Sequence, residues 1–489
     1  MKKTLLLLLS AILLAACMQN TKTENGNTRD GKATDSDSAI FKPTNIQEQI
    51  QYNRAIEVTL WGMPAVSMAA IRASLKRDLD ANLGDIIYCS KVLESRHEAL
   101  TANNQTPYVM TFLDLRNGPV VLEVPPATKK VAFFGSVIDS WEVPLADIGP
   151  SGEDAGRGGK YIFLPPGHNI VAPKGYIVVQ SATAFTHIAL RPIAIGEGTM
   201  EDAVAYSQTL KTYPFAQAAN PPANRYVDAY PKVWKQLPTY DLEFMRLLAE
   251  VVNAEPAQPK DAAMLGMLAT LGIEKGKPFS PNETQAKLLT AAVGKAAEYM
   301  QHEMLNNVFV PFWSDRKWMM VTLGKNYDFS YYGDGRLDYN GRATGFSYWA
   351  TFAPKRLGDP GKLPASYYLM NFRDKSGTLL KGTGLYRLNV PANTPVNDFW
   401  SIIAYDLTTN AFIHTTENRV GLSSYDKTKM IVNEDGSVDI YIGEKAPEGK
   451  ENNWIPTGGK DFWLMMRFYG PQQTLFDKKW EMPDVEEMK

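Results

Sequence analysis

Polar and aromatic side chains stand at predicted turns and strand ends in both halves of the chain, where they could bind a polar ligand. In the N-terminal half these residues are Asn104, Thr106, Tyr108, Asp139 and Trp141. In the C-terminal half they are Trp400, Asp406, Arg419, Asn453, Trp454 and Arg467. Aromatic faces can stack on a sugar or peptidoglycan ring while amides and carboxylates orient its hydroxyls. The same residue types also cap turns and fill cores, so a structural role is the alternative.

Three common chemical motifs lack their required spacing. A zinc-protease helix needs a second histidine four residues after His302, and that position is Asn306. The glycine-rich segment "GEDAGRGGKY" fails as a phosphate loop, because Lys160 is followed by Tyr161 and by a strand pattern. No serine stands in a G-x-S-x-G nucleophile elbow. Since the other histidines are scattered along the sequence, we expect no metal and no cofactor.

The N-terminus has the layout of a secretory signal peptide. Lys2 and Lys3 precede an apolar run over residues 5–14, and the segment "LAAC" that ends at Cys17 resembles the lipobox of bacterial lipoproteins. We therefore expect a signal peptide over residues 1–17 and a lipid anchor on Cys17 that binds the protein to a membrane. Residue 18 is Met rather than Asp, so the envelope location favoured is the outer membrane. An ordinary secreted protein with an incidental cysteine is the alternative.

Composition separates a polar leader from a globular remainder. Residues 18–43 contain too few apolar side chains to offset the entropy of ordering, which predicts a disordered tether. The 489-residue chain is 44% hydrophobic with a formal net charge of -2, which indicates two or three packed domains and no nucleic-acid partner. Cys89 is the second of two cysteines and lies in an apolar run, so we expect it to be buried without a disulfide.

The hydrophobic period changes three times along the chain. Residues 45–79 repeat with helical spacing, and we expect two helices on either side of the "WGMP" turn at residues 61–64. Residues 85–195 hold at least six short β-rich runs separated by Gly, Pro and Asn. A helical pattern follows over 199–307, in which Gly272 ends one helix and Ser280 caps the next. Strands return after residue 312, among them "FSYWATF" at 346–352 and "DFWLMMRFYG" at 461–470.

The last of these runs, residues 462–469, is apolar on both alternate faces except at Arg467. Such a run is typical of a strand covered on both sides, and a buried arginine there requires a partner. The loop that enters it carries Asn453 and Trp454. This loop could be a ligand site or only the turn that leads into a core strand.

Several blocks of sequence resemble, in order, a bacterial family built from the paired domains of unknown function DUF1254 and DUF1214. The N-terminal blocks are "ANNQTPYVMTFLDLRNGPVVLEVP", "GKYIFLPPG" and "GIEKGKPFSP". The C-terminal blocks are "NDFWSIIAYD", "DGSVDIYIGEKAPEGKENNWIPT", "WLMMRFYGP" and "FDKKWEMPDVE". The resemblance implies two jelly-roll-like sandwiches with helices between them and supplies no established activity. Gln105 replaces an Asp common in the family, and "RVGLSSYD" replaces its "RYSIGD", so a carboxylate role at residue 105 is not expected.

We therefore predict a multi-domain α+β protein with two antiparallel β-sandwich domains and an α-helical segment between them. The N-terminal sandwich with its leading helices spans 44–195, the helical segment 196–310, and the C-terminal sandwich 311–489. Three functions stay open: an envelope protein that binds a small or polymeric, carbohydrate-like ligand between its sandwiches, an envelope hydrolase or lyase whose residues meet only in the fold, and an assembly protein. The third would make the chain a homo-oligomer.

Overall fold

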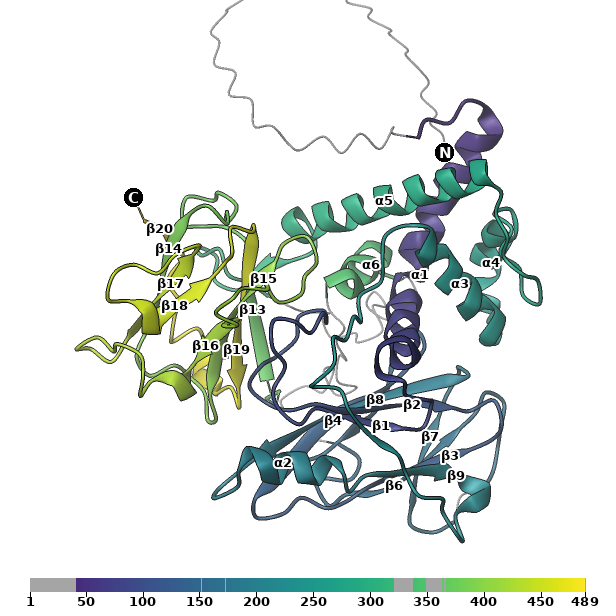
Figure 1. Cartoon of the computed structure of the whole chain (residues 1–489), viewed down its shortest axis with the longest axis horizontal. Coiled ribbons are helices and arrows are strands. Elements are labelled where there is room, and N and C mark those ends of the chain that lie inside the picture. The colour runs from purple at the N-terminus through teal and green to yellow at the C-terminus, as the bar shows by residue number, and fades with distance from the viewer. Residues whose placement is uncertain are drawn as a thin grey trace, which may run out of the picture. The chain divides into compact units, whose positions relative to one another are not determined.

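The structure is a computed structural model that describes residues 41–150, 152–171, 173–320, 337–348, 363–364 and 366–488. The predicted signal peptide, Cys17 and the tether as far as residue 40 lie outside the described residues. Within the described residues the chain forms seven α-helices and four β-sheets (Figure 1).

Two sheets form the N-terminal sandwich. The larger sheet has the strand order β10-β1-β2-β8-β4-β5, and the smaller has the order β7-β6-β3-β9. Their facing sides share an apolar core that includes Leu113, Phe133 and Phe163. The strands are β1 (Ile86–Tyr88), β2 (Val109–Asp114), β3 (Val120–Val124), β4 (Val131–Asp139), β5 (Pro144–Ile148), β6 (Gly159–Leu164), β7 (Tyr176–Gln180), β8 (Phe185–Ala194), β9 (Lys211–Pro214) and β10 (Tyr226–Asp228). The strand-rich pattern predicted for residues 85–195 is confirmed.

The C-terminal sandwich is built in the same way. Its sheets have the strand orders β11-β12-β13-β19-β15-β16 and β18-β17-β14-β20. Trp400, Ile440 and Leu464 lie in the apolar core between them. The strands are β11 (Val310–Pro311), β12 (Met319–Met320), β13 (Ser366–Asn371), β14 (Leu385–Val390), β15 (Trp400–Asp406), β16 (Gly421–Ser423), β17 (Val438–Gly443), β18 (Trp454–Pro456), β19 (Phe462–Tyr469) and β20 (Glu486–Glu487).

Five helices pack together into a helical layer around a core of their own, which includes Val66, Phe244, Leu289 and Phe346. They are α1 (Ile46–Leu79), α3 (Leu242–Ala254), α4 (Ala262–Ala269), α5 (Glu283–Asn306) and α6 (Tyr339–Tyr348). The short helices α2 (Met200–Ser207) and α7 (Gln473–Phe476) lie outside this layer. The predicted α+β class, with β-rich domains separated by helices, is confirmed.

Helix α1 is one helix rather than the predicted pair. It continues through Pro64, although a proline inside a helix removes one backbone hydrogen bond and costs roughly 3 kcal/mol. Every residue from Val58 to Ile71 is buried, so packing against α3, α5 and α6 offsets that cost. By length and composition α1 could cross a membrane, but most of its apolar stretch is buried inside the fold, as in the core helix of a globular protein.

Tertiary packing also corrects three other predictions. Helix α5 is capped by Asn282, whose side chain accepts from the N–H of Gln285, and not by Ser280. The predicted strand at 346–352 is wrong over residues 346–348, which end α6 between α1 and α5, while 349–352 lie outside the described residues. The segment predicted as helical also contains β9 and β10, which pair with β3 and β1. The predicted helix end is confirmed, since Gly272 follows α4 with a φ of +82°.

A further apolar core joins the two sandwiches and α1. Phe112 on β2, Ile71 on α1, and Trp463 and Met465 on β19 all belong to it. Because Leu464 on the opposite face of β19 packs inside the C-terminal sandwich, β19 is buried on both faces, as its sequence predicts. Cys89 also lies in this shared core, and burial raises the pKa of its thiol to about 12.

Candidate functional site

A cavity of about 240 Å³ lies between α1, the β4–β5 turn and the C-terminal end of α3. Val251, Val252, Leu265 and Ile273 give it apolar walls. Polar groups also reach its lining: Glu255, Gln258, Asp261, Glu274 and Lys275. A mainly apolar cavity with a few polar groups is typical of a small-molecule site.

Trp61 and Trp141 form the aromatic side of this cavity. Their ring centroids are 4.6 Å apart and the rings are tilted by 52°. Trp61 is buried in α1, while Trp141 is half-buried in the turn after β4. The Arg342 guanidinium of α6 lies 5.6 Å from the Trp141 ring and donates to the backbone carbonyl of Trp61 at 3.4 Å. The aromatic pair is therefore held by a cation from a third element.

Asp139 shapes the turn that carries Trp141. Its Oδ1 accepts from the backbone N–H groups of Trp141 at 2.8 Å and Val143 at 2.9 Å. Burial raises the pKa of this carboxyl to about 6, the charge of Glu255 acts in the same direction, and the two N–H donors oppose the rise. Asp139 thus holds Trp141 in place and titrates close to neutral pH.

Two more buried carboxyls lie near Asp139. Glu142 is 1% exposed, has a φ of +61°, and neither of its carboxyl oxygens finds a hydrogen-bond partner among the described residues. Burial raises its pKa well above the usual value, and the nearby Ser67 hydroxyl and the charge of Arg342 oppose the rise. Glu255 accepts from the Ser140 hydroxyl and the Ala184 N–H, and burial also raises its pKa. Burial therefore favours the neutral form of all three acids.

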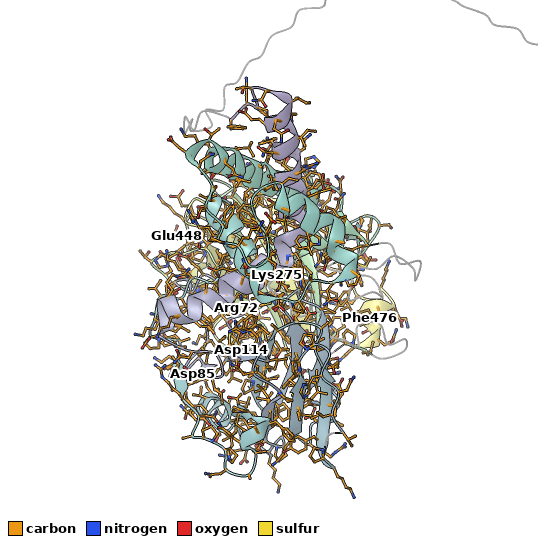
Figure 2. All side chains as sticks on the ribbon, turned by 90° about the vertical axis from the view of Figure 1, so that its right-hand side faces the viewer. Arg72, Asp85, Asp114, Lys275, Glu448 and Phe476 are labelled. Carbon is orange, nitrogen blue, oxygen red and sulfur yellow. The ribbon has the colours of Figure 1, made fainter. Side chains whose placement is uncertain are left out.

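Cations offset part of this acidity at the edge of the cavity. The Lys275 ammonium donates to the carbonyls of Glu255 at 2.6 Å and Asn253 at 3.1 Å, at the negative end of α3. Arg72 on α1 acts on Glu255 from the other side and stacks 4.0 Å from the Phe185 ring. Figure 2 labels both Arg72 and Lys275 near the middle of the view.

Thr106 and Tyr108 meet at a different place, beside Arg191 of β8. Arg191 donates to the Thr106 hydroxyl at 3.0 Å and to the Tyr108 hydroxyl at 2.6 Å, and its guanidinium lies 3.7 Å from the Tyr108 ring centroid. Asn104 is half-buried next to them and accepts from its neighbour Gln105. Sequence reasoning missed Arg191, although a lone arginine in an apolar strand is the same signal that singled out Arg467.

Arg467 lies where the two sandwiches touch. It is 2% exposed, and its Nη2 donates to the carbonyl of Thr101 at 2.8 Å and to the Tyr405 hydroxyl. The prediction that this buried arginine has a partner is confirmed, and the partners come from both halves of the chain. The structure therefore brings Thr106, Tyr108 and Arg467 to the contact between the sandwiches. Trp141 lines the cavity beside the helices, and Asp139 lies behind it in the same turn.

The remaining C-terminal candidates have structural partners. Asn453 is 1% exposed, donates to the carbonyls of Ile431 and Asp439, and accepts from the Ile431 N–H. Trp454 donates to the Gly443 carbonyl at 2.9 Å, and Arg419 donates to the carbonyls of Glu451 and Trp454. These contacts tie the approach loop of residues 450–456 to the strand β17 and its surroundings. These hydrogen bonds give the loop a structural role, and its role in ligand binding stays a prediction.

Trp400 and Asp406 belong to the body of the C-terminal sandwich. Trp400 is buried in its core. Asp406 is 4% exposed, accepts from the Thr408 N–H at 2.8 Å, and pairs with the Lys460 ammonium at 2.8 Å. Trp400 thus packs in the core, and Asp406 stabilises a turn and pairs with a lysine.

The sequence gives little sign of the other charged residues near Trp141. Glu142, Glu255 and Arg342 lie in separate segments and meet only through the packing of α3 and α6 against the N-terminal sandwich. Trp61 reads as a core residue of α1. Among the described residues, no three His, Cys, Asp or Glu side chains converge as a metal-binding group.

Two family models match the chain. "Protein of unknown function (DUF1254)" matches residues 85–214, and "Protein of unknown function (DUF1214)" matches residues 365–473. The chain is a member of the DUF1254/DUF1214 family. The DUF1254 match runs through β9, which closes the smaller sheet of the N-terminal sandwich.

A similar solved structure supports the fold of this DUF1254/DUF1214 protein. The crystal structure of the VPA0106 protein from Vibrio parahaemolyticus is similar with a TM-score of 0.52 and 18% identity, over 90% of this chain and 100% of that chain. A putative uncharacterized protein from Burkholderia cenocepacia covers 90% of this chain and 95% of its own at 13% identity, with a TM-score of 0.39. No curated protein matches the chain.

The hydrogen bonds of Asn453 predict a large loss of stability on truncation. Asn453→Ala removes a buried side chain that makes three hydrogen bonds to backbone groups, so we expect the free energy of unfolding to fall by about 2–4 kcal/mol. The exposed neighbour Asn452 serves as the control, and Asn452→Ala should change it by less than about 0.5 kcal/mol. Urea denaturation measures both values, and equal effects of the two substitutions would contradict the structural role.

The raised pKa of Asp139 predicts a pH dependence of stability. Between the ordinary value of 3.8 and the folded value of about 6 the native state binds the extra proton, so the free energy of unfolding falls as pH rises through this window. This loss of stability is complete above pH 6 and absent below pH 4. The pKa shift of Asp139 corresponds to a change in the free energy of unfolding on the order of 3 kcal/mol. Asp139→Asn keeps an acceptor for both N–H groups without a charge. The free energies of unfolding of the unmodified protein and of Asp139→Asn, measured by denaturation at several pH values, should therefore converge at low pH and separate toward pH 7. Parallel pH profiles would contradict the raised pKa of Asp139.

Proposed function

We propose that the chain is a lipid-anchored protein of the bacterial cell envelope that binds a small, carbohydrate-like ligand in the cavity beside Trp61 and Trp141. The observation that carries the proposal is the cavity itself, in which an aromatic pair meets the carboxyl of Glu255, whose pKa burial raises. A concave site with perturbed acids is the default candidate for function in a fold without a known activity. This places the ligand between the N-terminal sandwich and the helical layer, rather than between the two sandwiches.

The chemistry of the walls supports a ligand with one apolar face and a polar edge. The C–H face of a sugar ring can pack on Trp141 and on the apolar floor, while its hydroxyls reach Glu255, Gln258 or Asp261. Typical pockets for drug-sized ligands are about 300–1,000 Å³. A volume of about 240 Å³ suits a single ring better than a polymer, so a glycan would insert one residue.

Asp139 favours a second candidate function, an envelope hydrolase or lyase. A carboxyl with a pKa of about 6 can donate and accept a proton near neutral pH, which is the requirement for general acid or base catalysis. The Asp139→Asn variant separates the two functions, since retained binding with lost turnover would indicate catalysis. Retained turnover would remove Asp139 from the reaction.

Trp141 provides the test of ligand binding. We expect Trp141→Ala to weaken binding of the best neutral sugar or amino sugar in a panel of monosaccharides at least tenfold, about 1.4 kcal/mol, because the stacking face is lost. Trp454→Phe, on the loop tied to β17, should bind as the unmodified protein does. Isothermal titration calorimetry measures both, with circular dichroism as a check on folding. The proposal fails if no sugar binds or if Trp141→Ala binds equally well.

Cys17 provides the test of the anchor. The proposed lipobox predicts that Cys17→Ala, expressed from the full precursor, moves from the membrane fraction to the soluble fraction of the envelope. Ser10→Ala, within the same leader, is the matched control and should leave the protein in the membrane fraction. Immunoblots of separated inner and outer membranes give the readout. A Cys17→Ala protein that stays with the membrane would refute lipid attachment at this residue.

A further inference from the structure

The contact between the two sandwiches contains an arginine, Arg467, that forms no ion pair with the residues the structure describes. Arg467 is 2% exposed, and among the described residues its Nη2 alone finds hydrogen-bond acceptors. Nε and Nη1 have no hydrogen-bond partner among the described residues. These two nitrogens carry three of the five N–H donors of a guanidinium. Leaving charged donors unsatisfied away from water is costly, so their retention points to a partner outside the described residues.

The groups around Arg467 are phenols rather than carboxylates. Its guanidinium lies 5.2 Å from the Tyr368 ring centroid and 5.5 Å from that of Tyr405, and Tyr469 also acts on it. Burial raises the pKa values of Tyr405 and Tyr469, so these phenols stay neutral at ordinary pH. Their rings stabilise the cation and their hydroxyls can donate, but they do not neutralise it.

A second cation, Arg191, is linked by hydrogen bonds to Tyr469, whose phenol interacts electrostatically with Arg467. The Tyr108 hydroxyl accepts from Arg191 and from the Asn103 N–H at 3.0 Å, and the Asn103 side chain donates to the Tyr469 hydroxyl. Tyr469 follows Arg467 by two residues on β19, so both face the shared core. Within the described ranges neither arginine takes part in an ion pair. Two positive charges therefore share one network of hydroxyl and amide groups.

Partly exposed members of this network mark one side from which a ligand could approach. Arg191, Tyr108 and Tyr368 are half-buried, whereas Arg467, Tyr405 and Tyr469 are buried behind them. The half-buried members come from β8, the start of β2 and β13, so the N-terminal and C-terminal sandwiches both contribute.

We propose that the Arg191–Arg467 network is a binding site for an oxyanion, namely the carboxylate or phosphate group of an acidic ligand. An oxyanion accepts several charge-assisted hydrogen bonds at once, which matches three free guanidinium donors flanked by phenol hydroxyls. The site is separate from the sugar cavity and does not depend on the function proposed for it. The acidic group could belong to an acidic sugar, an organic acid or inorganic phosphate, and these share one recognition chemistry.

Thermal unfolding with defined anions tests the site. Glucuronate or inorganic phosphate at millimolar concentration should raise the Tm of the protein above its value in sodium chloride of equal ionic strength. Neutral glucose lacks the anionic group, so any effect of glucose on the Tm should be the same in the unmodified protein and in Arg191→Met. Arg191→Met should weaken the fitted anion affinity at least tenfold. Arg419→Met, which removes another arginine bonded to backbone carbonyls, should leave that affinity unchanged.

Arg467→Lys is the second test variant, and it keeps the positive charge of the buried side chain. Lysine cannot reproduce the guanidinium donors, so we expect a folded protein with weakened anion binding. Phosphate binding without glucuronate binding identifies a phosphate site, and the reverse identifies a carboxylate site. Absence of any anion-specific rise in Tm, or an unchanged affinity in both Arg191→Met and Arg467→Lys, overturns the proposal. Trp141→Ala should bind these anions normally, which distinguishes this site from the sugar cavity.

Discussion

The apolar core shared by α1 and the two large sheets is the constraint on which the rest of the structure depends. Each large sheet already packs one face inside its own sandwich, and this core covers the other face. A sheet buried on both sides cannot shift its register without exposing an entire set of apolar side chains. The core therefore fixes the N-terminal and C-terminal sandwiches against each other, and with them the polar residues at its margins.

Charges at those margins respond to burial in two opposite ways. On the cavity side, Asp139 and Glu142 can become neutral by taking up a proton, and burial shifts their pKa values in that direction. At the contact between the sandwiches, Arg467 has no such option, because a guanidinium stays protonated in proteins. The buried acids Asp139 and Glu142 can thus lose their charge in the absence of a ligand. The charge of Arg467 must instead be stabilised by neighbouring aromatic rings and by any bound ligand.

Local pattern accounts for the strands of both sandwiches and for the two-sided burial of β19, because alternation and run length are properties of a few consecutive residues. It does not account for the continuity of α1 through Pro64 or for the helical state of "FSY" in α6, which depend on helices distant in sequence. The candidate site divides in the same way. Asp139 and Trp141 can be predicted from the residue types of one local turn. The proximity of Glu142, Glu255 and Arg342 follows only from tertiary packing.

Cys89 gives the shared core an internal reporter. Its thiol is 1% exposed and its high pKa leaves almost no thiolate at neutral pH, so alkylating reagents and oxidants should not attack the folded protein. Reaction would then require that the two sandwiches separate from α1 or that the domain unfolds. The rate at which a thiol dye labels this single side chain would measure how often the junction opens, without any engineered probe.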